Sequence, residues 1–157
     1  MTLSKSDTPN YIDALVNLTA ISLKKGALNK ASSILEEIKL YPLDNIDFQL
    51  LTKFYTVKAN YYAINGNKRA AIEELAPVLT QVVDRAKNNT DSQQGYWSVE
   101  DEYLDAFELM VRLYIDDGQP GKALLLLDQL KTINDASLYN SPLVKAAKLS
   151  EEELTEE

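Results

Sequence analysis

The stretch NYYAINGNKRAAIEEL, residues 60–75, decides the fold because it contains a turn signal that returns twice elsewhere in the chain. Tyr61 and Tyr62 stand just before Gly66, and Ala70 and Ala71 stand four and five residues after it. Glycine takes the left-handed backbone conformation at a helix C-terminus without steric cost. The stretch therefore predicts a helical hairpin that turns at Gly66.

The same register surrounds two other glycines, so the chain is predicted to hold three such hairpins. An alanine follows each glycine by five residues, and apolar residues before each glycine recur at spacings of three and four, as on an amphipathic helix. The alanines are small enough to let the two helices of a hairpin approach closely. The residues that define the repeat are Gly26, Ala31, Tyr62, Gly66, Ala71, Tyr114, Gly118 and Ala123.

These spacings resemble the tetratricopeptide repeat, whose pattern is W-x2-L-G-x2-Y…A-x3-F…P. In the second copy, Tyr55, Ala59, Tyr62, Ala71 and Leu75 fill family positions, and Lys58 stands where the family has leucine. The resemblance implies an all-α fold, a right-handed stack of about three TPR-like helical hairpins plus a short C-terminal capping helix. A plain antiparallel helical bundle is the alternative, because it obeys the same packing rules.

The predicted organisation is one repeat domain, residues 9–149, after a disordered N-terminus, residues 1–8. The hairpins are expected at about 11–41, 46–86 and 99–134, and the cap helix at 141–149, where Pro142 marks a helix start. Glycine spacings of 40 and 52 exceed the family's 34, so longer second helices or loops are expected. Pro77 is expected to kink the second helix of the middle hairpin.

The last residues, 150–157, are predicted to form either an acidic tail or the start of a truncated helix. Ser150 and Glu153 have the spacing of a capping box, and Leu149 and Leu154 bracket them as a hydrophobic staple. The same segment contains five glutamates, and charge runs of this kind are commonly solvated tails.

Composition excludes several classes of function. The chain has no Cys and no His, which removes thiol nucleophiles, imidazole bases and the usual zinc and haem ligands. A net charge of −8 disfavours nucleic-acid binding, which needs clustered Lys and Arg. The longest apolar run, ALLLL at 123–127, is far shorter than a membrane span. We therefore expect no cofactor, no metal and no membrane partner, and a cytoplasmic location.

The sequence favours a non-catalytic protein-interaction or scaffolding module, because stacked hairpins present a concave surface that binds peptides or helices. By register, the predicted partner-binding face consists of Asp13, Val16, Ala20, Lys24, Lys53, Thr56, Asn60, Asp105, Glu108 and Arg112. Its mixed chemistry does not match the carboxylate clamp of some TPR proteins. Tyr96 and Trp97 form a second candidate contact, although Trp97 also fits an ordinary packing role before the helix that follows.

A looser resemblance concerns residues 117–154, which look like the last repeat and linker of bacterial proteins where TPRs precede a caspase-like CHAT domain. This resemblance implies the repeat segment of a larger regulatory protein. The alternatives are a free-standing peptide-binding adaptor and a self-associating homo-oligomer, for which the leucine-rich ALLLLDQL offers an apolar helix. A carboxylate-dependent enzyme is the remote alternative, with acidic clusters at 44–47 and 99–102 that read better as helix N-terminal charges.

Overall fold

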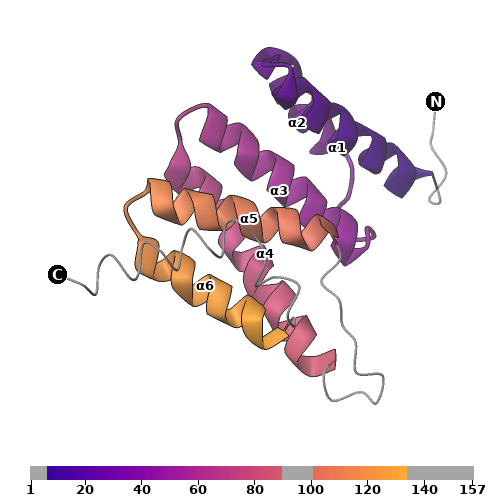
Figure 1. The fold of residues 1–157 in the computed structure, drawn as a ribbon. Coiled ribbons are helices and arrows are strands. Elements are labelled where there is room, and N and C mark those ends of the chain that lie inside the picture. The colour runs from indigo at the N-terminus through magenta and orange to yellow at the C-terminus, as the bar shows by residue number, and fades with distance from the viewer. Residues whose placement is uncertain (1–6, 90–100, 134–157) are drawn as a thin grey trace. The chain divides into compact units, whose positions relative to one another are not determined.

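The computed structural model describes residues 7–89 and 101–133, and these residues form six α-helices and no strand (Figure 1). The prediction of an all-α fold is confirmed. The helices are α1 (Thr8–Lys24), α2 (Leu28–Ile38), α3 (Phe48–Ile64), α4 (Lys68–Asn89), α5 (Asp101–Asp116) and α6 (Pro120–Ile133). The chain divides into two compact units, Met1–Glu74 and Leu75–Glu157, and the boundary falls inside α4.

The three turns that the glycines predict have the same geometry. Gly26, Gly66 and Gly118 have φ values of +74°, +82° and +72°. The amide of each glycine donates to the carbonyl three residues back, at 3.0–3.1 Å, and the next amide donates to the carbonyl five residues back, at 2.7–2.9 Å. These two bonds make the Schellman motif, which satisfies carbonyls at the end of a helix. Each turn therefore ends α1, α3 or α5 and leads directly into the next helix.

The alanines of the repeat lie where the register predicts. Ala31 and Ala71 are fully buried and Ala123 is 1% exposed. Thr19, Ala59 and Val111, each seven residues before a glycine, are also buried. Small side chains at these positions let the helices of a pair lie close together.

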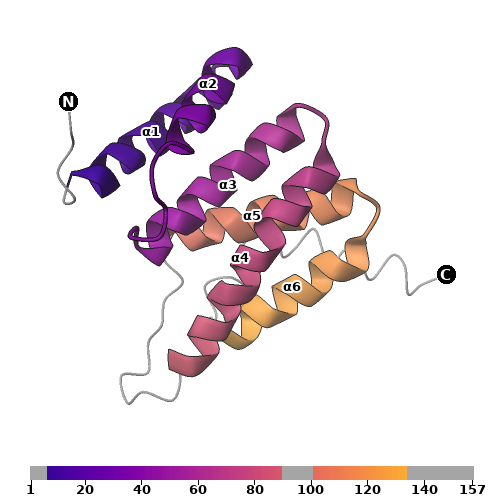
Figure 2. The same ribbon diagram turned by 180° about the vertical axis from the view of Figure 1, so that it is seen from behind.

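The core of the first unit is formed by three helices. α1 contacts α2 and α3, and α2 also contacts α3. Figures 1 and 2 show α1 and α2 lying side by side from opposite directions. The buried cluster comprises Ile12, Leu15, Val16, Ile34, Leu35, Ile38, Leu50 and Phe54. Tyr41, Leu43 and Ile46 of the connection between α2 and α3 pack against it, so that connection is part of the core as well.

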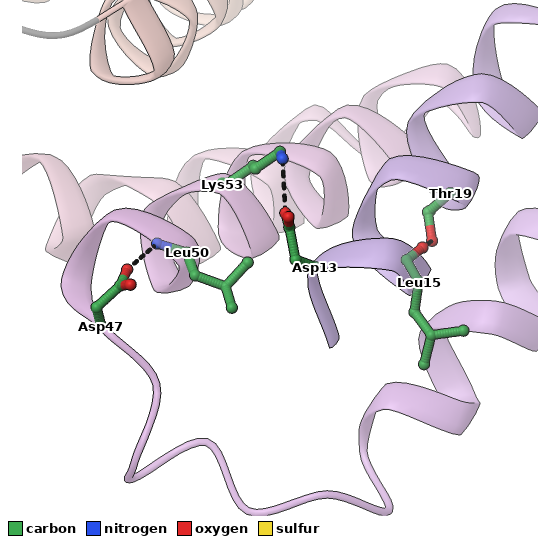
Figure 3. Close-up of polar contacts among 6 residues, drawn as sticks. All are labelled: Asp13, Leu15, Thr19, Asp47, Leu50 and Lys53. Atoms are coloured by element: carbon green, nitrogen blue, oxygen red, sulfur yellow. Dashed lines mark hydrogen bonds and ion pairs between the residues drawn. The ribbon is translucent and has the colours of Figure 1, made fainter. Parts of the chain in front are cut away.

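A side-chain cap fixes the start of α3. Asp47 has extended backbone angles, and its carboxylate accepts a hydrogen bond from the Leu50 amide at 2.7 Å (Figure 3). This is the N-cap arrangement, which satisfies an amide that has no partner within the helix. The prediction that the acidic cluster at 44–47 marks a helix N-terminus is confirmed for Asp47.

The second unit contains the rest of α4 together with α5 and α6, and α5 contacts α6. Its buried residues include Val82 of α4, Phe107 of α5 and Leu130 of α6. α4 has 22 residues, against 11 in α2 and 14 in α6, so part of the long glycine spacing lies in this helix, as expected. α4 does not end at Pro77, and Pro120 is the first residue of α6.

Several predictions lie outside the described residues: the cap helix 141–149, the segment 150–157, Tyr96 and Trp97, and the disordered N-terminus except for its last two residues. Within the described residues, α1 already begins at Thr8. No helix in that part of the chain is both long and apolar enough to cross a membrane.

Candidate functional site

An ion pair joins the first helices of the first two hairpins. Lys53 Nζ of α3 donates to Asp13 Oδ1 of α1 at 2.7 Å (Figure 3). Both residues stand thirteen positions before their turn glycines, so they occupy equivalent places in two successive repeats. Their side chains are 48% exposed for Asp13 and 27% for Lys53, so the pair lies at the surface. The structure thus brings together two members of the predicted partner-binding face.

Other members of that face in the first unit lie on the same two helices, C-terminal to this pair. On α1, Ala20 is half-buried and Lys24 is exposed. On α3, Thr56 and Asn60 are half-buried, and the Thr56 hydroxyl donates to the Thr52 carbonyl at 2.7 Å. This surface of α1 and α3 therefore offers a charged pair, a cation and an amide.

Val16 has to be removed from the predicted face. It is 1% exposed and belongs to the core cluster of the first unit. The reason is the helical period, since Val16 follows Ile12 by four residues and precedes Thr19 by three, and both of these are fully buried. Its side chain packs between helices and is not available to a partner.

The three remaining members lie on α5, in the second unit. Asp105 and Arg112 are exposed, and Glu108 is half-buried. The Arg112 guanidinium donates to the Glu108 carboxylate one turn away on the same helix. Exposed pairs at this spacing stabilise a helix by only a few tenths of a kcal/mol, about 0.3–0.5. Both side chains therefore stay energetically accessible to a partner.

The lysine that departs from the TPR pattern has a local structural role. Lys58 Nζ lies 3.1 Å from Glu74 Oε2, which joins α3 to the first part of α4. It also lies 6.0 Å from the ring centre of Phe54 and 5.8 Å from that of Tyr55, within cation–π range. The Lys58 side chain is only 19% exposed. An ion pair with aromatic packing therefore fills the place where the family has an apolar contact.

A cluster that the sequence did not reveal lies at the start of α1. The Tyr11 hydroxyl donates to Glu37 Oε1 at 2.6 Å, and its ring meets that of Tyr41 edge-on at 5.4 Å. The hydrogen bond to Glu37, with a further contribution from burial, raises the pKa of Tyr11 to about 12. Sequence separations of 26 and 30 residues carried no signal that these side chains meet.

A pocket of about 260 Å³ lies in the second unit, between the later part of α4, α5 and α6. Leu79, Met110 and Leu126 line it with buried apolar side chains, and among the described residues of the lining Lys122 is the only charged one. Leu125, also in the lining, is 61% exposed. The leucine run 124–127 was the sequence feature that indicated apolar surface outside the core. Four successive leucines cannot all face one core, because each residue of a helix is turned by 100° from the one before it.

In the described part of the chain, no three Asp or Glu residues lie close enough together to hold a metal ion. Every buried side-chain nitrogen or oxygen in the same part has a hydrogen-bond partner, as when Thr19 donates to the Leu15 carbonyl at 2.8 Å (Figure 3). Comparisons with protein-family models, with curated proteins and with solved structures gave no match. Function is therefore inferred from the contacts of this chain.

Proposed function

We propose that the chain is a non-catalytic protein-interaction module, a TPR-like stack of helical hairpins that binds a protein or peptide across its first helices. The Asp13–Lys53 ion pair carries this proposal, because it joins equivalent positions of successive first helices. Such a contact is expected when repeats stack in register, since each repeat packs against its neighbour in the same way. The contacts of α3 with both helices of the preceding hairpin support the same arrangement.

The partner surface in this proposal consists of that pair together with exposed and half-buried side chains further along α1 and α3. Lys24, Thr56 and Asn60 supply a cation, a hydroxyl and an amide, while Ala20 leaves room for a ligand backbone to approach. A peptide with both a carboxylate and a backbone segment to be hydrogen-bonded fits this set better than a purely apolar helix does. In the same proposal the module works in the cytoplasm as the repeat segment of a larger regulatory protein.

The test is selection of binding peptides from a random displayed library on the full chain, followed by affinity measurements with variants. Lys24→Glu and Asn60→Ala are expected to weaken the selected peptides by about tenfold each, which corresponds to ~1.4 kcal/mol. Lys30→Glu is the matched control, since Lys30 is an exposed lysine on α2, away from the proposed surface. Circular dichroism of each variant checks that the helices are retained.

Two results would refute the proposal. One is a selected peptide whose affinity falls as much with Lys30→Glu as with Lys24→Glu, which would indicate binding by general charge. The other is a failure of the library to yield any peptide that depends on Lys24 or Asn60. Either result would remove the surface of α1 and α3 as a partner site.

A further inference from the structure

The pocket of the second unit has the chemistry to bind an apolar side chain with negatively charged groups next to it. Its buried lining is apolar, through Leu79, Met110 and Leu126. At its edge, the exposed Lys122 places Nζ 5.8 Å from the ring centre of Tyr114. Lys122 is the only charge among the lining residues that the structure describes, and it favours a ligand with carboxylates.

The edge of the pocket also exposes apolar surface to water. Leu125 is 61% exposed although it adjoins the buried Leu126 in the same lining. Contact of an apolar ligand with Leu125 would remove that surface from water, which is favourable by about 25 cal/mol for each Å². The pocket therefore favours a ligand with a large aliphatic side chain.

The chain itself contains a segment with these two properties. Residues 149–157 read LSEEELTEE, in which Leu149 and Leu154 have the spacing of a hydrophobic staple around a capping box. That motif brings two leucines together as one apolar contact, surrounded here by five glutamates. The linking residues, 134–148, can span up to about 50 Å at ~3.3 Å per residue, which exceeds the ~21 Å length of a 14-residue helix such as α6.

We propose that this C-terminal segment, residues 149–157, binds the pocket of its own chain, with Leu149 and Leu154 against Leu125 and Leu126 and its glutamates beside Lys122. The preceding residues, 142–148, are a poorer match, because Lys145 and Lys148 would bring like charge to Lys122. The pocket then has a built-in ligand that any acidic, leucine-bearing partner would have to displace. This site lies in the second unit and does not depend on the proposed function of the surface of α1 and α3.

The absence of cysteine from the chain makes disulfide cross-linking a direct test. The double variant Thr80→Cys with Thr155→Cys places one thiol in the pocket lining and one beside Leu154 without removing an apolar contact. The control is Ser33→Cys with Thr155→Cys. Ser33 matches Thr80, since both are exposed and both donate to the carbonyl four residues back. Both proteins are oxidised at low micromolar concentration, and the rate of intramolecular disulfide formation is measured by mass spectrometry.

Docking of the segment raises the effective concentration of the two thiols, so the Thr80 pair is expected to close at least about tenfold faster than the Ser33 pair. Adding Leu154→Ser or Lys122→Glu should abolish that difference, and Lys122→Arg should retain it. Equal rates for the two pairs would overturn the proposal, and so would a rate that is insensitive to Leu154→Ser and Lys122→Glu. Disulfide-linked dimers at low concentration would also overturn it, since they would assign the pocket to the segment of a second copy.

Discussion

Gly66 shows at the residue scale what each turn requires from glycine. Its φ is +82°, and a Cβ added there would meet no atom within 4 Å apart from those of its two chain neighbours. Glycine is therefore required by the backbone conformation and not by a lack of space. Gly66→Ala is therefore expected to lower the free energy of unfolding by about 1–2 kcal/mol, the cost of left-handed backbone for an L-residue. Urea denaturation followed by circular dichroism measures the change.

The control for this variant is Gly121→Ala in the first turn of α6. Gly121 has no positive φ, and a Cβ added to it would likewise meet no atom within 4 Å. Alanine is expected to be neutral there or to stabilise by up to about 1 kcal/mol, because glycine loses more backbone entropy on folding. Equal losses for Gly66→Ala and Gly121→Ala would show that the left-handed turn is not what makes Gly66 necessary.

Tyr11 makes stability depend on pH in the alkaline range. Its hydroxyl donates to Glu37, and this bond, with burial, raises the pKa from the ordinary value near 10.0 to about 12. Between these two values the folded state binds more protons than the unfolded state, so the free energy of unfolding decreases as pH rises. The contribution of Tyr11 is complete below about pH 10 and is lost as pH rises through about 12.

The comparison that isolates this effect is the difference in unfolding free energy between the wild type and Tyr11→Phe. We expect a constant difference from about pH 7 to 9 and a shrinking one above about pH 10, as urea unfolding at each pH would show. Tyr62→Phe is a suitable control, because Tyr62 is a half-buried tyrosine that lacks the Glu37 contact of Tyr11. A wild-type advantage that persists unchanged to about pH 12 would contradict the role of the Tyr11–Glu37 bond.

At the scale of the element, the start of α3 depends on one carboxylate. Asp47 accepts from the Leu50 amide at 2.7 Å, and Leu50 itself belongs to the core cluster, so the cap also fixes the first turn that enters the core. Asp47→Ala is expected to lower the free energy of unfolding by about 1 kcal/mol. Asp44→Ala, in the exposed connection just before it, should change it by less than ~0.5 kcal/mol.

Thermal or urea unfolding of the two aspartate variants gives the test. Asp47→Asn provides a further check, because asparagine caps as well as aspartate does and should retain most of the stability. A similar loss in Asp44→Ala and Asp47→Ala would mean that net charge, and not the cap, governs this helix start.

The helices and their turns were predictable from the sequence because their signals are local. A glycine at a turn, an alanine five residues later and an aspartate before an apolar run each act within one or two helical turns. The assignment of side chains to the surface or to the core failed where packing between helices determines which residues are buried. Val16 is buried although the register placed it on the binding face.

Lys58 and Tyr11 illustrate the same limit over longer distances. The ion pair of Lys58 with Glu74 replaces an expected apolar contact, and the Tyr11–Glu37 bond joins two helices 26 residues apart in sequence. Neither partner can be chosen from periodicity, since α2 and α4 each carry adjacent glutamates and the register does not say which one faces a neighbouring helix. The pocket, too, is a property of three helices together, and the leucine run 124–127 of α6 indicates only that some of these leucines lie outside the core.

At the scale of the whole molecule, the division of the chain does not coincide with a hairpin boundary. It falls between Glu74 and Leu75, inside α4 and close to Pro77. Proline has no amide hydrogen, so the carbonyl of Glu73, four residues earlier, lacks its usual helical donor. The boundary between the two units therefore lies between Glu73 and Pro77, the two residues that cannot form the usual helical hydrogen bond.

From that division we expect a cavity made in the core of one unit to destabilise mainly the helices of that unit. Ile38 is fully buried in the cluster of the first unit, and Leu130 is 3% exposed in the second. Truncation of such a side chain to alanine costs about 2–5 kcal/mol. We expect Ile38→Ala to reduce the hydrogen-exchange protection of amides in α1, α2 and α3 while those of α5 and α6 keep theirs, and Leu130→Ala to do the reverse.

Hydrogen exchange resolved by peptide and read by mass spectrometry distinguishes the possibilities, because local and sub-global openings have different free energies. If both variants lower protection equally in all helices, the chain unfolds as one cooperative structure and α4 transmits the loss across Pro77. If the losses stay in the unit that carries the substitution, amides of α4 before Pro77 should lose protection in Ile38→Ala, and amides after Pro77 should lose it in Leu130→Ala. The amides at 71–74 and at 78–83 then locate the boundary within the helix, since these two stretches belong to different units.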